Sequence, residues 1–198
     1  MEIRKSVGVG WSSAGFSDRV SATVVQPSSP EVVLGAIVER LDSNLDGVSI
    51  VALQPAWVLI GKIIRDNPAE LLSLTPEQWE ELIAASYDKA GFDEVILTPR
   101  SGDFGRDVIA TKNGWGSVRI IDQVKAYKPG HLVTANDVRA LLGVLSADRA
   151  ATKGVVTTTS SFAPRISEDP FISPYVPYRL ELHDGEQVKS RLLSLTSG

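Results

Sequence analysis

The chain has 198 residues, of which 43% are hydrophobic and 22% charged, a composition typical of a soluble globular protein and not of a disordered one. It contains no cysteine and two histidines. Disulfides, thiolate metal sites and histidine-rich metal centres are therefore excluded, and any metal would be held mainly by oxygen. The net charge is −4, so attraction to nucleic acid would have to come from a local basic surface.

Neither a leader peptide nor a membrane span is expected. The first five residues run into a Gly/Ser-rich stretch that has no apolar segment. The longest apolar run, residues 56–64, is interrupted by Gly61 and Lys62 and is too short to cross a bilayer. We therefore expect a cytoplasmic protein.

Residues 1–70 are expected to form an N-terminal α/β region of unknown role. Valine-rich alternation and helical spacing predict, in chain order, strands over 5–11 and 19–25, a loop at 26–30, a helix over 30–41, a strand over 48–53 and helical turns over 55–72 that are interrupted at Pro68.

Residues 71–198 are expected to form one mixed α/β domain. Thr75, Pro76 and Gln78 have the types and spacing of a helix start, and that helix should end near Ala90. The later patterns predict three antiparallel strands over 95–98, 108–111 and 118–126, a helix over 134–145, a parallel strand over 153–159, a strand over 178–182 and a helix over 185–195. The expected fold is a mixed central sheet flanked by helices.

Polar side chains interrupt two adjacent strands of this sheet. Asp107 stands at the start of one strand, and period-two alternation places Gln123 and Lys125 on one face of the next, with Asp122 on the other. If these strands pair through the turn at 113–114, Asp107 comes close to Gln123 and Lys125. A carboxylate and an amide oxygen can hold Mg²⁺, and a nearby lysine can orient or deprotonate an attacking water. The expected chemistry is phosphodiester hydrolysis.

These residues resemble the Mrr-like branch of the PD-(D/E)xK restriction endonuclease superfamily, in its D…QxK form. The resemblance extends over about residues 71–193. It includes the opening helix Leu74–Glu80, the glycine-rich approach Ser101–Asp107, the later strand Gly154–Thr158 and the ending Glu181–Gly185.

The resemblance implies a restriction-endonuclease-like fold and a Mg²⁺-dependent DNA endonuclease, with Mn²⁺ as a substitute ion. It implies Asp107 and Gln123 as metal ligands and Lys125 as the catalytic lysine. Glu80, which follows an aromatic residue as the family's glutamate does, is the expected helical acid, with Glu81 as the alternative. Restriction of foreign or modified DNA is the implied biological role, as part of a defence system.

DNA is the expected partner, and a homodimer or a partner subunit stays open. Residues 95–140 carry seven basic residues against four acidic ones, so the expected catalytic segment is locally basic. Within it, Arg106, Lys128 and His131 are the predicted DNA contacts.

Each polar residue also has an ordinary explanation. Asp107 could shape a turn, Lys125 could protect a strand end, and Glu80 is favoured in the first turn of any helix. Two other functions therefore stay open. One is a catalytically silent nuclease-fold module that binds nucleic acid or protein, and the other is a structure-specific nuclease of the Holliday-junction type.

Overall fold

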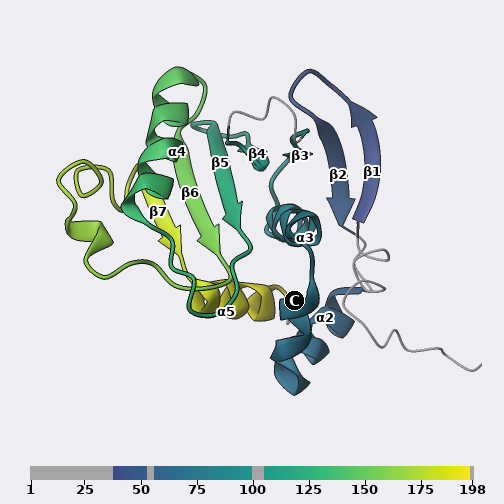
Figure 1. Ribbon diagram of the computed structural model, residues 1–198. Helices are drawn as coiled ribbons and strands as arrows, with labels where there is room; N and C mark the ends of the chain where they lie inside the picture. The colour runs from purple at the N-terminus through teal and green to yellow at the C-terminus, as the bar shows by residue number, and fades with distance from the viewer. Residues whose placement is uncertain (1–37, 53–55, 100–104, 197–198) are drawn as a thin grey trace, which may run out of the picture.

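A seven-stranded sheet runs through the described part of the chain, residues 38–52, 56–99 and 105–196 of a computed structural model (Figure 1). Its strands lie side by side in chain order: β1 (Val38–Ser43), β2 (Val48–Ala52), β3 (Glu94–Leu97), β4 (Val108–Lys112), β5 (Val118–Lys125), β6 (Lys153–Thr158) and β7 (Leu180–His183). Neighbours pair antiparallel from β1 to β5 and parallel from β5 to β7.

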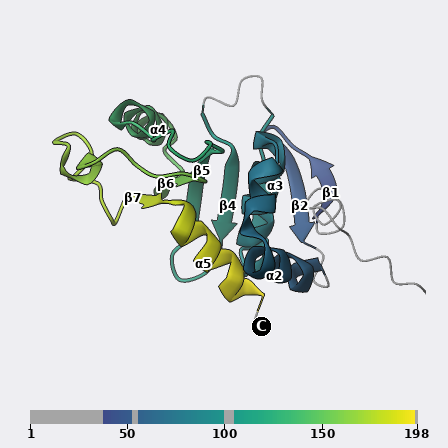
Figure 2. The same ribbon diagram turned by 60° about the horizontal axis from the view of Figure 1, so that its bottom comes forward.

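Helices cover both faces of the sheet (Figure 2). On one face lie α2 (Ala56–Asp66), the short 3₁₀ helix η1 (Pro68–Ser73), α3 (Pro76–Lys89) and α5 (Gly185–Leu195). The opposite face is covered by α4 (Ala135–Ala147) and by the segment between β6 and β7, which includes the 3₁₀ helix η2 (Ile166–Glu168). Each face therefore has its own apolar core, and β5 contributes to both, with Val124 on the α3 side and Ile121 on the α4 side.

Among the described helix starts, those of α3, α4 and α5 have a reciprocal capping box. The N-cap side chain accepts a hydrogen bond from the backbone N–H three residues on, and that residue's side chain accepts one from the N-cap N–H. The pairs are Thr75 with Gln78 in α3, Thr134 with Asp137 in α4, and Asp184 with Gln187 in α5. These local signals fix where the helices start, including α4, which starts shortly after β5 ends.

The α/β fold predicted from the sequence is confirmed. Helices α3 and α5, the antiparallel strands β3 to β5 and the parallel strand β6 lie where the residue patterns placed them. No helix in the described ranges has the length and apolar character that crossing a membrane requires.

The helix predicted over 30–41 is wrong in its described part, because residues 38–43 form strand β1. Pairing with β2, through Val38 with Ala52 and Arg40 with Ile50, decides the conformation here. Helix propensity is a weak preference that such tertiary pairing overrides. The strands predicted over 5–11 and 19–25 and the loop at 26–30 lie outside the described residues.

Elements from before residue 70 share the sheet and the core with those after it. Strands β1 and β2 extend the sheet beyond β3, and Trp57 and Ile60 of α2 lie in the same buried cluster as Leu82 and Leu192. The division into 1–70 and 71–198 stays a prediction, and the structure places residues from both ranges in one core.

Candidate active site

Asp107 lies directly before β4 and is anchored to the backbone of β5. Its N–H donates to the carbonyl of Asp122 at 3.1 Å, and its carboxylate Oδ2 accepts the N–H of Val124 at 2.7 Å. The carboxylate therefore takes the place that a strand carbonyl would have in the ladder. The structure thus brings Asp107 against the end of β5 that carries Gln123 and Lys125.

Gln123 is buried, and its Oε1 has no hydrogen-bond partner among the described residues. Gly105 lies against the same amide, because a Cβ on this glycine would stand 3.1 Å from Gln123 Nε2. Its φ of +78° is also a conformation that favours glycine. A buried oxygen without a partner is costly, and a cation or an ordered water would satisfy it.

The donor types of Asp107 and Gln123, one carboxylate and one amide oxygen, suit Mg²⁺, which takes a few protein oxygens and keeps several waters. Within the described ranges, no group of three or more histidine, cysteine, aspartate or glutamate side chains is placed to hold a metal. A metal site built on one carboxylate and one glutamine amide oxygen is consistent with that finding, because glutamine is not among those four residue types.

Lys125 ends β5 and is half-buried. Its carbonyl accepts hydrogen bonds from Tyr127 N–H at 2.8 Å, Thr159 N–H at 3.2 Å and Thr158 Oγ1 at 2.9 Å, which fix this end of the strand. Burial would raise the pKa of Asp137 in α4, but the hydrogen bonds from its N-cap and the charge of Lys125 outweigh burial and lower it. The backbone of Lys125 is therefore fixed at the end of the sheet, and its charge acts on Asp137 at the start of α4.

Glu80 is half-buried on α3 and lines a cavity of about 340 Å³ together with Thr98. The Thr98 N–H donates to the carbonyl of Asp107 at 3.2 Å, so this cavity adjoins the backbone of the predicted metal ligand. Glu81 lines the same cavity and forms an ion pair with Arg40 of β1. Both candidate helical acids therefore lie on the α3 side of Asp107.

The predicted DNA contacts have different surroundings. The Arg106 guanidinium lies 3.8 Å from the carboxylates of Asp46 and Asp148, so it belongs to an ion-pair network beside the sheet. Lys128 and His131 are exposed on the loop after β5. All three DNA contacts stay predictions.

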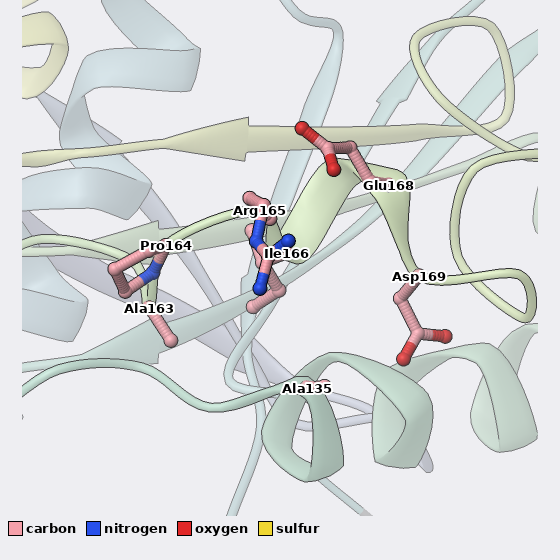
Figure 3. A pocket seen from close by; sticks show the side chains of 7 residues that line it. All are labelled: Ala135, Ala163, Pro164, Arg165, Ile166, Glu168 and Asp169. Carbon is pink, nitrogen blue, oxygen red and sulfur yellow. The ribbon is translucent and has the colours of Figure 1, made fainter.

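Another cavity, of about 360 Å³, opens between the start of α4 and the segment after β6 (Figure 3). It is lined by Ala135, Ala163, Pro164, Arg165, Ile166, Glu168 and Asp169. Asp169 forms an ion pair with Arg139 of α4. None of the predicted site residues lines this cavity, so it is separate from the candidate active site.

Sequence reasoning placed Asp122 on the opposite face of β5 from Lys125 but assigned it no role. The side chain is fully buried on the α3 side, where its Oδ2 accepts Tyr87 Oη–H at 2.8 Å and Thr157 Oγ1–H at 2.9 Å. Burial raises the pKa of Asp122 to about 7, against these hydrogen bonds and the charge of Arg191, which lower it. The available signal was a charged residue at a position where the alternation predicts an apolar one.

Comparison with known proteins gives a family match that includes these residues. The family model of the Mrr catalytic domain, described as a restriction endonuclease, matches residues 71–188. A comparison with curated proteins found no match.

Two solved structures are similar to the chain. One is the MspJI restriction endonuclease in complex with a 27-mer oligonucleotide (18% identity, TM-score 0.44, 69% of this chain and 30% of that chain). The other is the DNA modification-dependent restriction endonuclease AspBHI (20% identity, TM-score 0.46, 71% of this chain and 35% of that chain). The chain thus spans about a third of the length of each. Because the family model covers more than half of the chain, the chain belongs to the Mrr-type restriction endonuclease family.

Proposed function

We propose that this chain is a metal-dependent endonuclease that hydrolyses phosphodiester bonds in DNA, and that it acts in restriction of foreign or modified DNA. One observation carries the proposal. The carboxylate of Asp107 accepts the N–H of Val124, the residue after Gln123, whose buried Oε1 has no partner among the described residues, and Lys125 ends the same strand. Membership of a restriction endonuclease family supports the same chemistry and the role in defence.

Asp107 and Gln123 would hold Mg²⁺, with Mn²⁺ as a substitute. When bound, the ion supplies positive charge at the phosphate oxygens and at the attacking water. Lys125 orients or deprotonates that water, whose oxygen forms a bond to phosphorus as the bond to the leaving oxygen breaks. Glu80 is the proposed helical acid, and it lines a cavity on the α3 side of Asp107.

Contacts with the DNA backbone would come from the exposed loop after β5. Lys128 and His131 lie on this loop, within six residues of Lys125, where they can reach phosphates beside the scissile one. Arg106 follows the segment 100–104 on the approach to Asp107, and its ion pairs with Asp46 and Asp148 make it the weakest of the three contacts.

Cleavage of methylated and unmethylated plasmid DNA in Mg²⁺, Mn²⁺ or EDTA tests the proposal. Asp107→Ala and Lys125→Ala should each lower the metal-dependent rate by about a hundredfold or more. Lys189→Ala is the matched control, because Lys189 lies on α5 and pairs with Glu186 at 2.6 Å, away from β5. Cutting that persists in EDTA, or that is equal in all three variants, contradicts the assigned site.

The same assay separates the two other functions. Binding of DNA without cleavage under every metal would identify a catalytically silent nuclease-fold module. Preferential, symmetric cleavage of four-way junctions would identify a structure-specific nuclease. A difference between methylated and unmethylated plasmid would support restriction.

A further inference from the structure

The carboxylate of Asp122 is a point at which several elements meet behind the candidate active site. Tyr87 reaches it from α3 and Thr157 from β6, both through hydroxyl groups that donate to the same oxygen, Oδ2. Arg191 of α5 lies over the Tyr87 ring, 4.2 Å from its centroid. The Asp122 side chain therefore connects β5 with α3 and β6, and Tyr87 extends this contact to α5.

The backbone of Asp122 is tied to the predicted metal ligands. Its carbonyl accepts the N–H of Asp107 at 3.1 Å, and the next residue along β5 is Gln123. One residue further, the N–H of Val124 donates to the carboxylate of Asp107 at 2.7 Å. Any shift of β5 at Asp122 must therefore move both the carboxylate of Asp107 and the amide of Gln123.

An apolar side chain would suit the fold at this position. The neighbours on the same face of β5, Ile120 and Val124, are apolar and pack in the α3-side core. A buried carboxylate is costly even when it is hydrogen-bonded, and replacing such a group by an apolar side chain is often neutral or stabilising. Asp122 differs from a packing residue in the kind of its contacts, because two directed hydrogen bonds tie β5 to α3 and to β6.

We propose that Asp122 is a positioning residue. From the face of β5 opposite the site, its hydrogen bonds to Tyr87 and Thr157 fix the strand so that Asp107 and Gln123 point their oxygens at one place. The role of Asp122 in catalysis rests on the proposed function, but its effect on the position of β5 can be measured in metal-free protein.

The first measurement is backbone amide exchange by NMR on the full chain in EDTA. Asp122→Ala should lower the protection of the Asp107 and Val124 amides by at least about tenfold relative to the Leu141 amide in α4. Asp122→Asn keeps an acceptor for both hydroxyl groups and should restore most of this protection. If Asp122 contributed only to global stability, its replacement would lower the protection of all three amides by the same factor.

The second measurement is the affinity of the protein for Mn²⁺ alone, by titration calorimetry. Loss of the groups that orient metal ligands typically weakens metal binding by about 10- to 100-fold. We expect a loss in this range for Asp122→Ala and a smaller one for Asp122→Asn. Tyr87→Phe removes one of the two donors and provides the same test if the alanine variant does not fold.

Ser86→Ala is the matched control for a buried polar group. Ser86 precedes Tyr87 in α3, and its hydroxyl donates only to the carbonyl of Ile83 in the same helix, at 2.7 Å. This variant should leave Mn²⁺ affinity and the relative protection of Val124 unchanged.

Two results decide the inference. Uniform loss of protection, or unchanged Mn²⁺ affinity, in both Asp122→Ala and Tyr87→Phe overturns it. If wild-type protein neither binds Mn²⁺ nor cuts DNA, the proposed function fails, and the selective loss of protection at Asp107 and Val124 still decides whether Asp122 positions the strand.

Discussion

Replacing Trp57 by alanine tests whether the elements before residue 70 fold together with the rest of the chain. Trp57 lies in α2, is 1% exposed, and belongs to the same core as Leu82 of α3 and Leu192 of α5. One turn further along α2, Gly61 lies so close to the end of α5 that a Cβ would stand 2.6 Å from Thr196 Oγ1. Helix α2 therefore packs directly on the nuclease core.

The expected loss of stability follows from the burial of the indole. A buried tryptophan hides about 250 Å² of surface, which at about 25 cal/mol per Å² corresponds to about 6 kcal/mol. An alanine side chain retains part of this burial. The indole N–H of Trp57 is buried without a partner among the described residues, so its removal reduces the expected loss of stability by about 1–2 kcal/mol. We therefore expect Trp57→Ala to lower the free energy of unfolding by about 3–4 kcal/mol.

Urea unfolding followed by circular dichroism measures this loss. One transition with an unchanged slope, shifted to lower urea, is expected for Trp57→Ala. Trp115→Ala is the matched control, because Trp115 is fully exposed at the β4–β5 turn and its loss should change stability by less than about 0.5 kcal/mol. Two transitions, of which only the first moves, would refute the reasoning and make the N-terminal elements a separate folding unit.

Three further predictions concern the pH dependence set by Asp122 and the substitution of two glycines. The pKa of Asp122 is about 7 in the folded protein against an ordinary 3.8, so the native state holds the proton more tightly. The contribution of Asp122 to stability should therefore be greatest below about pH 4 and fall by about 4 kcal/mol as the pH rises to about 7. Urea unfolding in EDTA measures this fall, and wild-type and Asp122→Asn curves that run parallel with pH contradict it. Gly154→Ala places a Cβ 2.6 Å from Leu145 Cδ1 and should lower the free energy of unfolding by about 1–3 kcal/mol. An unchanged melting temperature would show that Leu145 and α4 can shift to make room for the methyl group. Gly105→Ala, at φ +78° and 3.1 Å from Gln123 Nε2, should destabilise by about 1–2 kcal/mol and weaken Mn²⁺ binding, and calorimetry showing wild-type affinity would separate this glycine from the site.

The relative placement of Asp107, Gln123 and Lys125 could be predicted from local patterns, because these residues lie on strongly patterned elements, and their roles stay predictions. Alternation along β5 places Gln123 and Lys125 on one face and Asp122 on the other, and the described packing has Ile121 and Val124 on opposite sides of the same strand. The short β4–β5 turn forces those strands to pair, which brings Asp107 to the end of β5.

Features set by distant contacts could not be predicted in this way. Val38 and Leu41 have a spacing that suits a helix, but pairing with β2 makes this segment a strand. The partners of Asp122 are both 35 residues away along the chain, in α3 and in β6, so no local window contains them. A buried carboxylate can be recognised from the sequence as unusual, but its partners become visible only in the folded chain.

The position of β5 explains why the candidate site forms at this edge of the sheet. Because β5 pairs antiparallel with β4 and parallel with β6, the start of β4 and the ends of β5 and β6 meet at one edge. Asp107 is contributed by the first, Lys125 by the second, and Thr158, which bonds the Lys125 carbonyl, by the third. The parallel pairing also requires a crossover, so the chain returns through α4, which begins near this edge. Asp122 also connects these three strands to α3, because its carbonyl accepts the N–H of Asp107 and its carboxylate accepts the hydroxyl groups of Thr157 and Tyr87. A shift of β5 would therefore displace Asp107, Gln123 and Lys125 together.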